Sequence, residues 1–178
     1  MSQIVPSVRV TIGGESFEAL LRCDLAPRSC ARLEGLMPYQ GQLVHARWSG
    51  ESCWSPMAAV WHSGPPLPPE NATAYPSPGQ VLLFGGALSE PELLVPYGST
   101  CFASKAGLLA GNPVLTIEDR LNRLAELGRQ ILWNGAVDLR IERIEARSNI
   151  RDERGRPQPF PEQELTLRST GDMTNDGH

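Results

Sequence analysis

Apolar and polar residues alternate along several short stretches of the chain, and a period of two is typical of half-buried β-strands. Residues 8–12 and 137–141 show this alternation. Gly13-Gly14 provides a turn after the first of them, so residues 15–21 can return as the second strand of a hairpin. Residues 80–84 are almost wholly apolar, which predicts a buried strand. Further strands are predicted at residues 42–48, 53–61 and 92–97.

A first, short helix is predicted to start near Pro27, because proline suits the first turn of a helix. Asp24 or Ser29 is expected to offer a side-chain oxygen to the free amides of that turn. Pro38 ends the segment, since the residue before a proline avoids the helical conformation.

A second, longer helix is predicted at residues 117–132, with Thr116 as its cap and two acids, Glu118 and Asp119, in its first turn. Its apolar residues recur at helical spacing and form one stripe. Strands therefore precede, separate and follow two helices. This order predicts a mainly β fold, a closed or half-closed antiparallel barrel of about eight strands capped by helices.

Two segments have a different character from the rest of the chain. Residues 64–78 are rich in proline, which excludes a central strand and predicts an ordered surface loop or a lid. From residue 147 onward the chain is charged, polar and rich in proline and arginine. We therefore predict a barrel domain at residues 1–146. Residues 147–178 are predicted to be an extension, partly disordered or strapped over a neighbouring subunit.

Composition and charge exclude several classes of function. The chain has 178 residues and a net charge of −4, with no block of basic residues, so nucleic acid is not an expected partner. No apolar stretch approaches the ~20 residues that cross a bilayer, and no signal peptide is visible, so we expect a cytoplasmic protein without a membrane partner.

Metal and cofactor chemistry is not expected either. The four cysteines contain no Cys-x-x-Cys pair and are expected to be free thiols. The three histidines are scattered, and only His45 with Glu51 leaves room for a metal ion. We expect no cofactor.

Lys105 is the only lysine of the chain, and the other fifteen basic side chains are arginines. A lysine is a compact, mobile point charge whose pKa moves readily on burial, which an arginine cannot match. The residue also lies in the densest cluster of unusual residues, at positions 97–112. One interpretation is that this ammonium faces a ligand, and the other is that it is the one surface lysine left in an arginine-rich chain.

Four segments together resemble a known family. They are His45-Ala-Arg-Trp-Ser-Gly-Glu51, Tyr75-Pro-Ser-Pro-Gly-Gln80, Gly85-Gly-Ala-Leu-Ser-Glu90 and the glycine-rich stretch at 96–112. In these motifs the chain resembles the bacterial cyclophilin-like family of unknown function, domain-of-unknown-function family 3830, over roughly residues 5–146. The resemblance implies a small eight-stranded barrel and supplies no reaction. Arg47 can occupy the place of the arginine of true cyclophilins, but their glutamine-glycine-glycine stretch is missing, so prolyl isomerase activity is not expected.

Four charged residues stand at motif positions beside glycines: Arg47, Glu51, Glu90 and Lys105. The fork of Arg47 matches a carboxylate, and Lys105 can stabilise developing negative charge. Glu90 or Glu51 can serve as a base if an apolar surrounding raises its pKa. Structural salt bridges are the alternative for both glutamates.

Five further residues are candidates for the same site. Cys101 is a nucleophile if the cation four residues on favours its thiolate, or otherwise a buried core thiol. Trp54 and Tyr97 can hold a planar ligand or belong to the core. Asn112 can bind a ligand or end its loop, and His45 alternates with Arg47 and can share its face.

The sequence thus leaves two hypotheses. The first is a small-molecule enzyme, a cofactor-independent hydrolase or lyase acting on a small carboxylate, amide or cyclic imide. The second is a non-catalytic binding module or accessory subunit of a catabolic complex. Convergence of the four charged groups in one pocket favours the enzyme, and in both cases we expect a homo-oligomer.

Overall fold

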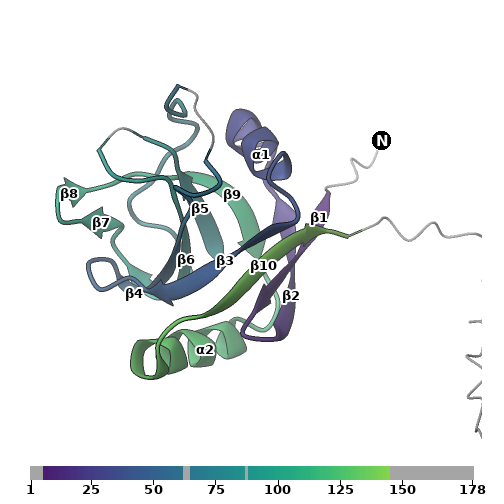
Figure 1. The fold of residues 1–178 in the computed structure, drawn as a ribbon, viewed down its shortest axis with the longest axis vertical. Coiled ribbons are helices and arrows are strands. Elements are labelled where there is room, and N and C mark those ends of the chain that lie inside the picture. Colours follow the sequence, from purple (N-terminus) through teal and green to yellow (C-terminus); the bar gives the residue numbers. More distant parts are fainter. Residues whose placement is uncertain (1–5, 62–64, 87, 145–178) are drawn as a thin grey trace, which may run out of the picture. The chain divides into compact units, whose positions relative to one another are not determined.

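The computed structural model describes residues 6–61, 65–86 and 88–144, and these residues form a closed β-barrel with two helices (Figure 1). Its strands follow one another around the barrel in the order β1-β10-β3-β4-β6-β5-β9-β2. Every neighbouring pair is antiparallel. The predicted fold class is therefore confirmed. The predicted extension at 147–178 lies outside the described residues.

The strand bounds follow the alternating and apolar stretches of the sequence. The first hairpin joins β1 (Ser7–Ile12) to β2 (Glu15–Leu21) through Gly13-Gly14, both at positive φ. The other barrel strands are β3 (Tyr39–His45), β4 (Gly50–Pro56), β5 (Gln80–Phe84), β6 (Glu92–Thr100), β9 (Asn112–Ile117) and β10 (Val137–Arg143). A separate two-stranded sheet joins β7 (Ala103–Ser104) and β8 (Gly107–Leu108).

The barrel interior is filled by every second side chain of its strands, as the period of two requires. Its two open ends are closed by the helices, which lie at opposite ends of the barrel in Figure 1. The longer helix, α2 (Leu121–Asn134), buries Leu124, Leu127 and Ile131 against the interior. The shorter helix, α1 (Pro27–Glu34), buries Cys30 and Leu33. These helix residues and the barrel interior form one apolar core.

The predicted start of α2 is wrong by four residues. Thr116 and Ile117 belong to β9, where they pair with Leu20 and Ala19 of β2. The helix begins only after Arg120, which has a positive φ of 50°. Pairing with a neighbouring strand outweighed the local helical pattern at these positions, as tertiary contacts commonly do.

The predicted cap of α1 is also wrong. Neither Asp24 nor Ser29 caps the helix with its side chain. The carboxylate of Glu70, 41 and 42 residues further along the chain, accepts the amides of Ser29 and Arg28 at 2.9 and 3.0 Å. The hydroxyl of Ser29 donates to the same carboxylate at 2.7 Å.

The proline-rich segment is an ordered surface loop with a single bridge, Thr73 to Gly111, as far as the described residues reach. Asn112 of β9 binds this loop through two hydrogen bonds. Its side chain accepts the amide of Glu70 at 2.9 Å and donates to the carbonyl of Pro68 at 2.9 Å. The loop is thus bonded to both β9 and α1. Neither helix of the described chain is long and apolar enough to cross a membrane.

Candidate functional site

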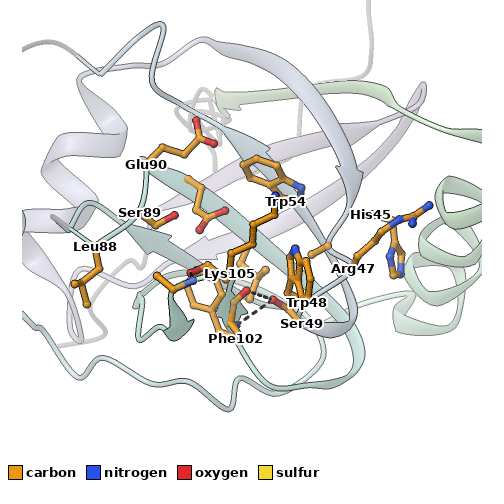
Figure 2. Close-up of a pocket in the computed structure, with 16 residues that line it drawn as sticks. His45, Arg47, Trp48, Ser49, Trp54, Leu88, Ser89, Glu90, Phe102 and Lys105 are labelled. Atoms are coloured by element: carbon orange, nitrogen blue, oxygen red, sulfur yellow. Dashed lines mark hydrogen bonds between the residues drawn. The ribbon is translucent and has the colours of Figure 1, made fainter.

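A cavity of about 460 Å³ opens on the outside of the barrel wall. Three segments enclose it: the turn after β3, the loop before β6, and the β7–β8 hairpin. Figure 2 shows side chains from all three gathered around this hollow, with Trp48 and Lys105 near its centre and Leu88 and Ser89 on the loop side.

The floor of the cavity is apolar because β5 and β6 are covered on both faces. Leu93 and Val95 of β6 point into the barrel, so the alternate residues Glu92 and Leu94 point outward. Leu94 belongs to a second apolar cluster outside the barrel core, and Trp54 packs against that cluster. The other buried members are Ala46, Leu82, Phe84, Phe102 and Leu109. Continuous apolar runs, rather than alternating ones, are what such doubly covered strands require.

Glu92 is the acidic group of this apolar floor. Only 7% of its surface is exposed, and no side-chain hydrogen bond to its carboxyl is found within the described residues. Burial, and secondly the nearby charge of Glu90, raises the pKa of Glu92 from 4.5 to about 7. A carboxyl with this pKa can both release and take up a proton near neutral pH.

Three further charged residues line the cavity. Lys105 lies at the tip of the β7–β8 hairpin, Arg47 in the turn after β3, and Glu90 in the loop before β6; all three are exposed. In Figure 2 the guanidinium of Arg47 points to the side of α2, away from Lys105. Arg47 therefore lines the rim, and Lys105 is the cation nearer the centre.

Two tryptophans give the cavity an aromatic surface. Trp54 of β4 is half-buried on the floor, and Trp48 is 62% exposed in the turn beside Arg47. Indole rings with one free face can stack against a planar ligand. Phe102 supports the floor from below, edge-on to Phe84 with ring centroids 6.0 Å apart.

His45 stands where the cavity meets the barrel interior. Its Nε2 lies 2.9 Å from the hydroxyl of Tyr97, and its Nδ1 is buried without a partner among the described residues. Burial, and secondly the charge of Arg47, lowers the pKa of His45. The ring is thus held neutral, and its orientation is fixed by Tyr97.

Tyr97 does not reach the cavity. It faces the barrel interior beneath α2, against Gly128, where a side chain larger than glycine's would collide with its ring. Burial is the main reason why the pKa of its hydroxyl is raised. The predicted ligand contact of Tyr97 is replaced by a structural contact with His45.

Glu51, Cys101 and Asn112 also lie away from the cavity. The carboxylate of Glu51 accepts the amide of Ser99 at 2.9 Å. Cys101 is exposed beyond the end of β6, so it does not share one strand with Lys105. Asn112 is buried and bound to the proline-rich loop, and its side chain also donates to Ser29 Oγ at 2.8 Å.

Of the predicted site residues, the structure therefore gathers five around one cavity: Arg47, Glu90, Lys105, Trp54 and His45. Three of the four charged residues line the cavity, with the guanidinium of Arg47 turned away from Lys105, and Glu51 does not line it. Sequence reasoning missed Glu92, although a signal was present, since it is the one acid at the start of the apolar run 92–95. In the described ranges, no three His, Cys, Asp or Glu side chains stand together as a metal site would require.

The family model described as "Protein of unknown function (DUF3830)" matches residues 8–143. The chain therefore belongs to this family, which the sequence motifs had indicated. A comparison with curated proteins gave no match.

The comparison with solved structures found chains similar to this one, including McbB and the hypothetical protein AF2241. McbB, solved in complex with tryptophan, superposes with a TM-score of 0.57 at 23% identity, over 78% of this chain and 45% of the McbB chain. This chain thus spans less than half of McbB, and the likeness shows a shared cyclophilin-like fold alone. The hypothetical protein AF2241 from Archaeoglobus fulgidus has a TM-score of 0.46 at 12% identity, over 80% of this chain and 98% of its own.

Proposed function

We propose that the protein is a small-molecule enzyme that uses Glu92 as its general acid-base group. The observation that carries the proposal is the burial of this one carboxyl in an apolar cavity, with a pKa raised to about 7. Burying an ionisable group without a partner costs stability, so such groups are concentrated at functional sites.

The substrate class follows from the groups around Glu92. Trp54 and Trp48 favour a planar, aromatic or conjugated ligand. The ammonium of Lys105 favours a carboxylate, amide or imide oxygen and can stabilise negative charge that develops there. Arg47, exposed at the rim, can close on an anionic end by rotating its side chain. The cavity volume of about 460 Å³ suits a ligand of this size.

The reaction type that fits these groups is hydrolysis or elimination. In an elimination, Glu92 as carboxylate takes a proton from the carbon next to a carbonyl, while Lys105 stabilises the oxyanion that forms. The enolate then expels the leaving group from the β-carbon, and the leaving group takes the proton from Glu92. In a hydrolysis, Glu92 takes a proton from the attacking water and returns it to the leaving group. The sequence favoured Glu90 or Glu51 as the base. We assign this role to Glu92 instead, because Glu51 lies outside the cavity and Glu90 is exposed.

The test is a panel of aromatic carboxylates, amides and cyclic imides, including tryptophan because McbB was solved with it. Binding is measured by thermal shift, where a ligand at 100 times its dissociation constant adds about 2.7 kcal/mol of stability. Each ligand found is then assayed for turnover. We expect Glu92→Gln to lower kcat about 10²- to 10⁴-fold with little change in affinity.

Two controls sharpen this test. Glu18→Gln, which alters an exposed carboxylate on β2, should leave kcat unchanged. If Glu92 acts as base, kcat/KM should rise with pH through about 7. Glu90→Gln should move that rise to lower pH, because it removes the neighbouring negative charge. A Glu92→Gln variant with full activity would contradict the proposal.

The second candidate is a binding module without catalysis. The openness of one side of the cavity, with Trp48 62% exposed, favours this alternative, because catalysis commonly requires water to be excluded. Ligands that bind tightly and are never turned over by the wild type would support it.

A further inference from the structure

The β7–β8 hairpin is too small to hold its own shape. It has two paired positions, Ala103 with Leu108 and Ser104 with Gly107, and Lys105-Ala106 forms its tip. Isolated two-stranded hairpins are at best marginally stable in water, even when they are longer than this one. The tip that carries Lys105 must therefore be held by contacts from outside the hairpin.

Those contacts come mainly from Ser49, a buried residue with 2% of its surface exposed. Its hydroxyl donates to the carbonyl of Ala103 at 3.0 Å and accepts the amide of the same residue at 3.1 Å. Its own carbonyl accepts the amide of Cys101 at 3.1 Å. One serine thus satisfies three backbone groups at the base of the hairpin.

Ser49 also joins two walls of the cavity. It belongs to the turn after β3 that carries Arg47 and Trp48, and it is bonded to the segment that carries Lys105. Figure 2 shows its hydrogen bonds to this segment as dashed lines beside Trp48. The buried ring of Phe102 anchors the same segment, and its amide donates to the carbonyl of Ala74 at 2.7 Å.

We propose that Ser49 is a positioning residue, which fixes the β7–β8 hairpin so that Lys105 stays over the cavity. It acts through Lys105 and does not itself touch the reacting atoms. What Lys105 does to a ligand rests on the proposed function, whereas the holding of the hairpin does not.

The single lysine allows the opening of the hairpin to be measured by proteolysis. Endoproteinase Lys-C cleaves after lysine, so its single target is the Lys105–Ala106 bond. Cleavage requires the hairpin to open, and its rate then follows the population of the open form. Ser49→Ala removes two hydrogen bonds, each worth roughly fivefold in that population. We expect cleavage about 25-fold faster than in the wild type.

Ser52→Ala is the matched control. Ser52 is a buried serine on the adjacent strand, and its hydroxyl has no partner among the described residues. Both variants lose one buried serine hydroxyl, but Ser52→Ala keeps the hairpin contact. We expect the cleavage rate of Ser52→Ala to equal that of the wild type. Equal rates for Ser49→Ala and Ser52→Ala would overturn the proposal.

A second variant covers the case in which Ser49→Ala does not fold. Ala103→Pro removes the amide hydrogen that the Ser49 hydroxyl accepts, and it leaves Ser49 in place. It too should accelerate cleavage after Lys105. An unchanged cleavage rate in this variant would overturn the proposal, as an unchanged cleavage rate in Ser49→Ala would.

A ligand measurement separates this proposal from the proposed function. With a ligand from the panel, Ser49→Ala and Lys105→Met should each weaken binding, and the double variant should be no weaker than Lys105→Met alone. Additive losses would overturn the positioning role. If Lys105→Met binds as well as the wild type, the role of Lys105 in the proposed function fails, and the cleavage rates still decide whether Ser49 holds the hairpin.

Discussion

The position of Glu92 in its pleated strand determines the surroundings of its carboxyl. The sequence predicts it as the first residue of a strand, and in β6 it lies on the same face as Leu94, over an apolar cluster. Its side chain therefore meets the cavity instead of bulk water. The raised pKa follows from this position, since burial leaves the carboxylate poorly solvated.

This raised pKa has a consequence for stability. Below about pH 4.5 Glu92 is protonated in both the folded and the unfolded chain, so it has no effect. Between 4.5 and about 7 the unfolded chain loses the proton first, so the free energy of unfolding falls as the pH rises. Above about pH 7 the loss in the free energy of unfolding is constant. At one pKa unit per 1.36 kcal/mol, it amounts to roughly 2 to 3 kcal/mol after allowance for the open side of the cavity.

Glu92→Gln, neutral at every pH, should therefore be more stable than the wild type at pH 8 by that amount and equally stable at pH 4. Urea unfolding at the two pH values measures the difference, with Glu18→Gln as the exposed control. A constant difference at both pH values would mean that the carboxyl is not buried as described.

Sequence reasoning identified residues at the site better than it identified roles. Arg47, Glu90, Lys105 and His45 line the cavity, because their motifs lie in the loops and strand ends that enclose it, and Trp54 joins them from β4. Tyr97 and Asn112 stand in the same glycine-rich stretch, but the chain turns between them, and both are buried. Proximity along the chain could not reveal on which side of the barrel wall each side chain points.

At the scale of elements, long-range contacts fix the ends of the helices. The alternating strands and the two apolar helix faces were readable from the sequence, whereas α1 receives its cap from Glu70 and α2 loses its first turn to β9. Neither contact leaves a local signal, since the partners lie 41 and 98 residues apart for Ser29–Glu70 and Ala19–Ile117, by subtraction of their numbers.

Removal of the cap tests the importance of Glu70. Glu70→Ala leaves the amides of Arg28 and Ser29 without their acceptor and frees the proline-rich loop from α1. We expect a loss of about 1 to 2 kcal/mol in the free energy of unfolding at pH 7, comparable with the loss of a helix cap. Chemical unfolding measures it, and Glu18→Ala should change the stability by less than about 0.5 kcal/mol.

The charge on Glu70 is part of this contact. Burial alone would raise the pKa of its carboxyl, but hydrogen bonds from Ser29 and from the backbone amides of Arg28 and Ser29 outweigh burial and lower it. The stabilisation is therefore present above the ordinary pKa and lost as the pH falls through the lowered one. Glu70→Ala should differ least from the wild type in acid, and a difference that grows on acidification would contradict the cap.

At the scale of the whole molecule, the described barrel ends at residue 144, close to the end of the family match at 143. We predict that a chain ending at Ile144 folds with the thermal midpoint of the full chain, because every barrel strand is retained. Light scattering on both forms tests the expected homo-oligomer. If the extension straps one subunit to another, the shortened chain should form assemblies with fewer subunits, and an unchanged number of subunits would place the interface on the barrel.

The closing seam of the barrel sets the order in which the chain can fold. The strand β1 begins at Ser7 and pairs with β10, which ends at Arg143, so the first and last strands of the barrel share one ladder. Until β10 has been synthesised, β1 and β3 each present an unpaired edge to other chains. Contacts of such long sequence separation form slowly. The growing chain therefore remains an open sheet, whose unpaired edges can pair with other chains, until almost the whole barrel has been synthesised.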